Sequence, residues 1–345
     1  MLLLRLGLAV LVLLSTCAVA QEHAQPPATT AQTQQPPLAF HCAQDGDIDP
    51  MRHAVVASAA TTFLQTLLGG EPGAAWDTMT AHGQSSATRQ QFVTSAVLGP
   101  LAAQPRNLTL RHTFLIHVVG TPAPGTRVTC GADPTDPMQS YNMSVVPAPE
   151  QAYTLFTADA PNNGVMFTLW LVRDNVGWKV NGYAYNVSTV AGRDAQHLWT
   201  LARTEHQHGH EFNATLLYFA ANQIAQRGPD FSFGFAPQIA AEQATITRPK
   251  QISGKPPFIF DDQDGAFFVS SIGPTDAGGR LFLAVTHEIE PWDNNKDADR
   301  LNRDLISLIK RTFPEYSTAF EGILVQAFAP RTGQTLVTAD ETARR

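Results

Sequence analysis

The hydrophobic pattern is clearest over residues 165–185, where two apolar runs flank a turn at 174–177. Both runs are rich in β-branched and aromatic residues, and Gly177 suits the left-handed position of a hairpin loop. In the first run both alternating faces are mostly apolar, with Leu169 on one face and Trp170 on the other. The pattern predicts a β-hairpin whose first strand is central in a sheet. Helices should cover one face, and another segment or subunit should cover the other.

Helical periodicity comes before this hairpin. Asp49-Pro50 is typical of an N-cap followed by proline at the first helical position, and apolar residues at helical spacing continue as far as Gly69-Gly70. Two shorter helices are expected near 74–79 and 87–98. Strand patterns follow at 107–119, 127–130, 140–146 and 152–157. Helices followed by antiparallel strands predict an α+β fold in which a curved antiparallel sheet packs round the leading helices.

Two short segments carry a family resemblance. They are Ala75-Trp76-Asp77-x-Met79 in the second helix and Gly177-Trp178-Lys179-Val180 in the hairpin. With the order of elements, they make residues 48–188 similar to the nuclear transport factor two-like, or cystatin-like, cone domain. The resemblance implies an interior lined by Trp76, Phe92, Phe114, Trp170 and Trp178. These side chains either enclose a small apolar molecule or fill the core.

Enzymes of this cone fold place an acid or a base, Asp or His, inside the cone. The predicted strands contain no Asp or Glu, which argues against carboxylate catalysis. His112 is the candidate that remains, because strand alternation places it on one face with Leu110 and Phe114. A histidine on an apolar face is also typical of hydrogen-bonded structure. We therefore expect a non-catalytic domain; the alternative is an isomerase- or hydrolase-type enzyme that uses His112 in the cone.

The second half of the chain predicts two further parts. Residues 189–250 return to helical periodicity, interrupted at Gly209, and predict an αα-hairpin connector that docks on a neighbouring domain. Ala214-x3-Tyr218-x2-Ala221 resembles one tetratricopeptide-type unit, with no second copy at the required period. Residues 251–340 predict a separate, small ββαββ domain whose helix ends at Phe313-Pro314.

The turn of the αα-hairpin concentrates metal-capable side chains in His206, His208 and His210. His206 and His210 share a helix face only if the helix runs through Gly209, where the apolar pattern indicates a turn. We interpret the cluster as a solvated polar turn. No cofactor is expected.

The first 20 residues have one Arg, a long apolar run and the ending Ala18-Val19-Ala20, which is typical of a secretory signal peptide. The alternative is a lipid anchor at Cys17, which Thr16 disfavours. Residues 21–47 are rich in Pro and Gln and predict a disordered linker. No later stretch has the ~20 apolar residues of a membrane span. We expect a protein exported to the periplasm or the extracellular space.

The chain has 345 residues, a hydrophobic content of 43% and a formal net charge of −7, which gives no attraction for nucleic acid. Cleavage of the leader leaves Cys42 and Cys130, and an oxidising compartment favours a disulfide between them over two buried thiols. We thus expect an exported, non-catalytic protein that binds a small ligand or a protein partner through the cone-like domain. A further alternative is an envelope assembly or scaffold component, in which the outer face of the hairpin forms a homodimer or partner surface.

Overall fold

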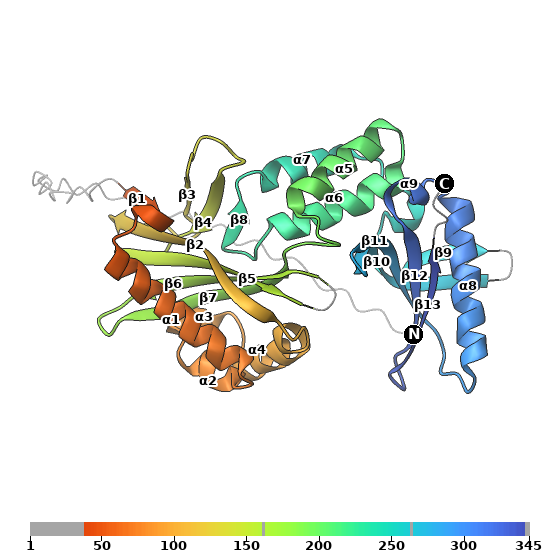
Figure 1. Ribbon diagram of the computed structural model, residues 1–345, viewed down its shortest axis with the longest axis horizontal. Coiled ribbons are helices and arrows are strands. Elements are labelled where there is room, and N and C mark those ends of the chain that lie inside the picture. The colour runs from red at the N-terminus through yellow and green to blue at the C-terminus, as the bar shows by residue number, and fades with distance from the viewer. Residues whose placement is uncertain (1–37, 161–162, 263–264, 342–345) are drawn as a thin grey trace, which may run out of the picture. The chain divides into compact units, whose positions relative to one another are not determined.

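The computed structural model describes residues 38–160, 163–262 and 265–341, and within these ranges the protein is a mixed α+β structure (Figure 1). One antiparallel sheet has the strand order β1-β2-β5-β6-β7. Its strands are β1 (Ala39–Gln44), β2 (Arg106–Val119), β5 (Glu150–Asp159), β6 (Val165–Arg173) and β7 (Trp178–Val187). A smaller sheet, β3-β4-β8, comprises β3 (Arg127–Gly131), β4 (Ser140–Ser144) and β8 (Phe231–Phe233).

Helices from the start of the domain pack on one face of the five-stranded sheet. They are α1 (Pro50–Leu68), α2 (Pro72–Asp77), α3 (Ala81–Ser85) and α4 (Arg89–Ala96), with a 3₁₀ turn (Asp45–Asp47) before them and a π-helical turn (Val97–Leu101) after them. α1 begins as the sequence predicts, because the Asp49 side chain accepts a hydrogen bond from the N–H of Arg52 and Pro50 takes the first position. Phe63 and Leu64 of α1 share a buried core with Leu169 of β6.

β6 is an interior strand that is buried on both faces, as the hydrophobic pattern predicts. Leu169 belongs to the helix-side core, whereas Trp170 belongs to a second core with Phe114, Met143 and Phe231. Met143 and Phe231 lie on β4 and β8, so the three-stranded sheet covers this face. The alternative of a scaffold component expects a partner or a second subunit on this face of the hairpin. In the structure, β4 and β8 of the same chain cover it.

β1 lies in the segment for which the sequence predicts a disordered linker over 21–47. That prediction is wrong for residues 39–47, because 39–44 pair with β2 and a 3₁₀ turn follows. The signal peptide, Cys17 and the rest of the linker lie outside the described residues. Cys42 on β1 and Cys130 on β3 form the predicted disulfide, with their Cα atoms 5.9 Å apart. The bridge joins the edge of the five-stranded sheet to the smaller sheet.

α5 (Ala195–Gln207) and α6 (Glu211–Ala225) form the predicted αα-hairpin, which turns at Gly209 with φ of 75°. A positive φ is accessible to glycine without strain. β8 follows α6 and pairs with β4, and α7 (Ala236–Thr245) comes after it. The predicted connector, 189–250, therefore contributes a strand, β8, to the sheet that contains β3 and β4.

The C-terminal part contains a five-stranded mixed sheet of order β13-β12-β11-β10-β9. After a 3₁₀ turn (Lys250–Ile252), its elements are β9 (Phe258–Asp262), β10 (Gly265–Ala277), β11 (Arg280–Glu288), α8 (Asn295–Thr312), α9 (Tyr316–Ala319), β12 (Gly322–Ala329) and β13 (Gln334–Glu341). The order is βββααββ, in which α9 is a single short turn, where the sequence predicts ββαββ. β11 and β12 pair in parallel, because α8 provides the crossover between them.

One continuous core contains residues of the αα-hairpin and of the C-terminal sheet. Leu217 and Ile224 of α6 belong to it together with Leu283 of β11 and Leu305 of α8. The predicted connector and the predicted separate domain therefore share buried side chains, which the separate hydrophobic patterns of the two segments do not reveal.

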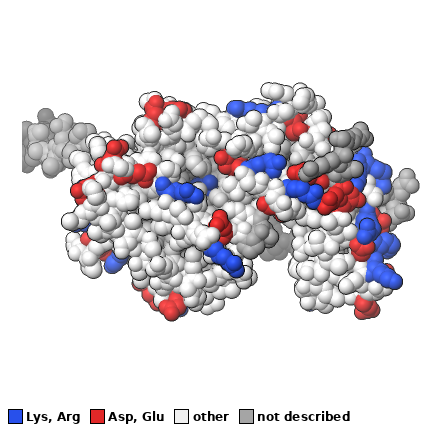
Figure 2. All heavy atoms as spheres, viewed as in Figure 1, with Lys and Arg blue, Asp and Glu red and all other residues white. Residues whose placement is uncertain are grey.

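On the face of the molecule drawn in Figure 2, acidic and basic side chains are interspersed on a largely uncharged surface, with basic side chains gathered over α8. None of the helices in the described ranges is long and apolar enough to cross a membrane.

Candidate functional site

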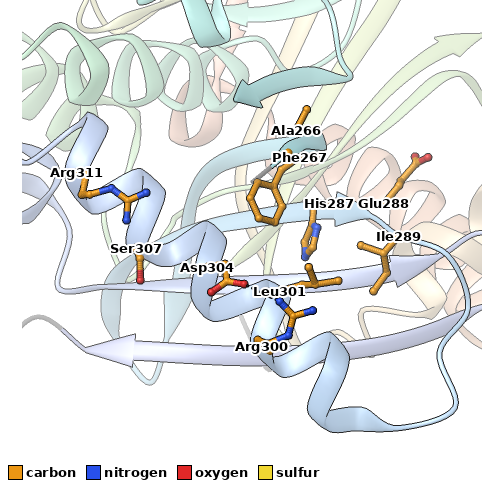
Figure 3. A pocket seen from close by; sticks show the side chains of 11 residues that line it. Ala266, Phe267, His287, Glu288, Ile289, Arg300, Leu301, Asp304, Ser307 and Arg311 are labelled. Atoms are coloured by element: carbon orange, nitrogen blue, oxygen red, sulfur yellow. Dashed lines mark hydrogen bonds and ion pairs between the residues drawn. The ribbon is translucent and has the colours of Figure 1, made fainter. Parts of the chain in front are cut away.

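A cavity of about 690 Å³ lies between α8 and the adjoining parts of β10 and β11 (Figure 3). α8 contributes Arg300, Leu301, Asp304, Ser307 and Arg311, and the two strands contribute Phe267, His287 and Glu288 among others. The volume is within the range of about 300 to 1,000 Å³ that is usual for small-molecule sites.

The polar wall of the cavity is one face of α8. Arg300, Asp304, Ser307 and Arg311 recur at spacings of four, three and four residues, which places them in a row along the helix, as Figure 3 shows. Arg300 donates a hydrogen bond of 3.2 Å to Asp304. With Glu288 of β11, whose carboxylate points away from α8 in Figure 3, the lining residues include two basic and two acidic side chains.

The buried end of the cavity is formed by His287, which has no solvent-exposed surface. Leu281, Leu283 and Val285 precede it at alternate positions of β11 and are all buried in the core. His287 thus occupies the fourth inward position of an otherwise apolar strand face. Sequence reasoning missed it, although a histidine at an inward strand position was a signal that could have been used.

Asn302 of α8 fixes the protonation of the His287 ring. Asn302 Nδ2 lies 3.1 Å from the carbonyl oxygen of Leu336 and 2.9 Å from Thr338 Oγ1, and a carbonyl can only accept. Asn302 Oδ1 therefore faces His287 Nε2, at 2.7 Å, and it is also an acceptor. His287 Nε2 must carry the hydrogen, so in the neutral ring Nδ1 carries the lone pair.

The Asn302 amide is itself held by a directed chain of hydrogen bonds. Thr338 Oγ1 accepts from Asn302 and donates to Asp299 Oδ1 at 2.8 Å. Asp299 also accepts a hydrogen bond of 2.9 Å from Arg303. Asn302 is fully buried, so these contacts hold its side chain in one orientation.

Burial lowers the pKa of His287 below its ordinary value and outweighs the hydrogen bond with Asn302, which acts in the opposite direction. The imidazole is therefore neutral at neutral pH. Within the described ranges, His287 Nδ1 is a buried atom with no hydrogen-bond partner. A buried acceptor without a donor is unfavourable, so His287 Nδ1 reduces the stability of this part of the core.

Comparisons of the chain with protein-family models, with curated proteins and with solved structures give no match.

The structure pairs the sequence candidate His112 with Asp45. His112 Nδ1 lies 2.8 Å from Asp45 Oδ2, and the N–H of Thr113 donates to Asp45 Oδ1 at 2.7 Å. Burial raises the pKa of Asp45, but the hydrogen bonds from His112 and Thr113 outweigh it and leave that pKa below its usual value. Both partners are more than a third exposed, at 37% and 39%. Sequence reasoning missed Asp45 because it falls in the predicted linker.

His112 lies on the face of β2 that points away from the leading helices. Its ring centroid is 6.1 Å from those of Phe114 and Tyr141, on the side of the three-stranded sheet. Leu108 and Leu110 pack instead against the helix-side core. A register shift between Leu110 and His112 separates them, because a β-bulge reverses the alternation of faces. The expectation that His112 shares a face with Leu110 is wrong.

The five aromatic pocket candidates divide between two cores. Trp76 and Phe92, with ring centroids 5.2 Å apart, and the half-buried Trp178 pack on the helix side. Phe114 and Trp170 pack on the opposite face of the sheet. The structure therefore does not bring them together around one interior.

Trp170 also lines a smaller cavity of about 120 Å³ with His82, Thr168, Asn181 and Asp230. Thr168 Oγ1 and Asn181 Nδ2 are buried and have no partner in the part of the chain that the structure describes. A cavity of this volume holds about four water molecules at about 30 Å³ each. Its size and polarity are typical of a small cleft that holds water.

The histidine cluster of the αα-hairpin makes hydrogen-bond contacts with carboxylates across the turn. His206 Nδ1 lies 3.0 Å from Glu211 and His210 Nδ1 lies 2.9 Å from Glu205, and the ring of His208 lies 5.8 Å from that of His210. Among the residues that the structure describes, no group of three His, Cys, Asp or Glu side chains is arranged to hold a metal ion.

Proposed function

We propose that the protein is an exported, non-catalytic binding protein and that the cavity beside α8 holds a small ligand. The observation that carries the proposal is the buried His287, whose hydrogen is fixed on Nε2 by Asn302 and whose Nδ1 is an acceptor without a partner within the described ranges. A buried imidazole with one fixed tautomer at the end of a ligand-sized cavity is typical of a binding site.

The cone-like arrangement that we propose for residues 48–188 serves in this protein as a packed support. Its helix side contains a continuous aromatic cluster in which Phe92 and Tyr183 lie 6.0 Å apart and Phe63 and Tyr183 lie 5.8 Å apart, measured between ring centroids. Phe167 lies 6.4 Å from the same tyrosine. Side chains that fill this space favour a structural role for the first part of the fold and a binding role for the C-terminal cavity.

Nuclear magnetic resonance on the mature chain with a library of small fragments tests the proposal. We expect some fragments to shift the backbone signals of Phe267, His287 and Leu301 together. Leu301→Trp fills the cavity and should abolish those shifts, whereas Lys296→Trp, at an exposed position of the same helix outside the lining, should leave them unchanged. Fragments that bind elsewhere, or equally well to Leu301→Trp, would contradict a binding role for this cavity.

The His112–Asp45 pair favours a second candidate function, general-base catalysis at the surface of the first part. Asp45 accepts the hydrogen on His112 Nδ1, which leaves Nε2 as the basic nitrogen, and this is how a carboxylate orients a catalytic histidine. Ester hydrolysis with p-nitrophenyl acetate distinguishes the two functions. Catalysis predicts a large loss of rate in His112→Ala and a small loss in His117→Ala, an exposed control on the same strand. A binding protein predicts equal, low rates.

A further inference from the structure

We infer that the C-terminal sheet has a second binding site, on the outer face that α8 does not cover, and that its ligand is a small organic cation. The site centres on the carboxylate of Glu288 and the ring of Phe268. It lies on the other side of β11 from the cavity of the proposed function, so the inference goes beyond that function and does not depend on it.

Strand alternation places Glu288 and Phe268 on this outer face. His287 is buried and bonded to Asn302 of α8, so Glu288 points the other way, and Figure 3 shows its carboxylate directed away from that helix. On β10, Phe267 lies with its ring centroid 5.7 Å from that of His287, whereas the next residue, Phe268, is 49% exposed. Both side chains of the inferred site are therefore accessible to a ligand.

The register of the sheet sets Glu288 between two aromatic residues. Glu288 pairs with Phe268 of β10 on one side and with Phe328 of β12 on the other. Phe328 is half-buried and alternates with the buried Ala327 and Ala329, so it shares the outer face. Residues directly opposite in an antiparallel pair have Cβ atoms about 5 Å apart, which brings Phe268 next to the carboxylate. Glu288 forms no hydrogen bond or ion pair within the described residues.

A cavity of about 420 Å³ lies beside this row, within the range of volumes usual for small-molecule sites. Phe268 and Glu288 line it together with the segment after β11 and the turn after β12, which contribute Ile289, Glu290, Pro291, Pro330 and Arg331. Arg331 forms an ion pair with Glu290, so these two charges compensate each other. The carboxylate of Glu288 leaves the lining with one negative charge that has no partner.

The chemistry of this lining favours an ammonium group that carries a flat apolar substituent. An ammonium donates a charge-assisted hydrogen bond to a carboxylate and is attracted to the face of an aromatic ring. Phe268, Pro291 and Pro330 offer apolar surface to the substituent. An anion would be repelled by Glu288, and a neutral molecule would displace water from the carboxylate without replacing its hydrogen bonds. One unpaired carboxylate supplies too few ligands for a metal ion.

Three probes with the same ring test the inference on the unaltered protein by nuclear magnetic resonance. Benzylammonium carries the cation, benzyl alcohol is neutral and of similar size, and benzoate carries the opposite charge. We expect benzylammonium to bind about tenfold more tightly than benzyl alcohol, the combined effect of an exposed ion pair and a cation–π contact, and benzoate to bind most weakly. Nuclear Overhauser effects should connect the ring of benzylammonium with the ring of Phe268.

Variants at exposed positions identify the groups that recognise the cation. Glu288→Gln keeps the size of the side chain and removes its charge, so benzylammonium should then bind no more tightly than benzyl alcohol. The matched control Glu71→Gln makes the same change in net charge at an exposed glutamate without a side-chain capping bond and should keep the tenfold preference. Phe268→Leu keeps an apolar side chain but removes the ring, and should weaken benzylammonium binding about threefold.

Equal affinity for benzylammonium and benzyl alcohol, or a preference that survives in Glu288→Gln, would overturn the inference. Leu301→Trp, which fills the cavity beside α8, separates the two sites. Benzylammonium binding that persists in this variant supports the second site. If the variant abolishes it, the probe binds beside α8, and the inference fails while the proposed function stands. If benzylammonium binds as expected but no fragment binds beside α8, the inference stands and the proposed function fails.

Discussion

Two regions of this protein each centre on a histidine, and they use opposite ring nitrogens. His112 directs Nδ1 to the carboxylate of Asp45 at 2.8 Å, at a position open to solvent. His287 directs Nε2 to the amide of Asn302 at 2.7 Å, inside the fold. The partner of His112 is a carboxylate, whose own pKa is lowered, whereas burial keeps the His287 imidazole neutral.

The difference shows that the partner and the solvent exposure of a histidine decide its role more than its presence does. An exposed histidine–carboxylate pair contributes little to stability and can exchange its contacts with water. A buried neutral imidazole beside a cavity keeps an acceptor that water reaches poorly. The first arrangement suits a surface pair and the second suits ligand recognition.

The largest expected effect concerns the disulfide that holds β1, the strand next to Asp45. Replacing Cys42 and Cys130 together by serine should lower the free energy of unfolding of the first part by about 4 kcal/mol, because the bridge closes a loop of 88 residues. Urea unfolding followed by tryptophan fluorescence measures the loss. The His287 Nδ1 signal should not change in the folded variant. A shift of that signal would show that the two histidine regions are coupled.

The second effect concerns the partner of His287. Asn302→Leu leaves the His287 Nε2–H and the carbonyl of Leu336 without their buried hydrogen bonds and should lower the free energy of unfolding by about 2 kcal/mol. The ¹⁵N spectrum should also show a mixture of His287 tautomers in place of one. The matched change Asp45→Asn, at the exposed pair, should lower stability by well under half as much. Equal losses of unfolding free energy in the two variants would contradict a larger contribution from the buried histidine contact than from the exposed one.

Acid should affect the two regions in different pH ranges. The pKa of His287 is lowered by burial. As pH falls below 6.5, the ordinary value for histidine, the unfolded chain therefore gains a proton that the folded chain does not, and stability falls. The pKa of Asp45 is also lowered, so its contribution is present above about 3.8 and is lost as pH falls below that value.

Unfolding free energies measured from pH 7.5 to pH 3 test this order. His287→Gln should flatten the decline that begins near 6.5, whereas Asp45→Asn should alter only the decline near 4. A decline near 6.5 that persists in His287→Gln would assign it to another histidine.

The smallest effect concerns the rim of the cavity. Arg300→Gln removes one exposed ion pair with Asp304 and should change stability by about 0.3 kcal/mol. Urea unfolding of the variant and the unaltered chain measures the difference. A loss above about 1 kcal/mol would contradict the assignment of this pair to the exposed surface.

Much of the fold could be predicted from the sequence because long periodic segments dominate it. The Asp49 cap, the doubly buried hairpin strand and the αα-hairpin turn at Gly209 all follow from local patterns. The short elements could not be found in this way. β8 is three residues long, and β1 lies in a Pro- and Gln-rich region where composition favours disorder, yet both pair with distant strands.

The candidate site was harder to predict because it depends on tertiary contacts. His287 and Asn302 meet only when α8 packs on the C-terminal sheet, and fifteen residues separate them. Asp45 reaches His112 only because β1 pairs with β2. The bulge before His112 reverses a strand face in a way that alternation alone cannot show. The pattern of hydrophobic and polar positions reports local structure only, so it cannot show these contacts.

The pairing of β8 with β4 limits where the chain can be cut to give a fragment that folds alone. A fragment that stops at residue 188, where the cone-like pattern ends, would lack Phe231, which packs against Phe114 and Tyr153 with ring centroids 6.3 and 5.7 Å away. The edge of β4 that pairs with β8, and the aromatic side chains that Phe231 covers, would then be open to water. Expression of the first half alone should therefore give an aggregating product unless the fragment extends beyond Phe235, so the boundary of autonomous folding lies well past the boundary that sequence resemblance marks.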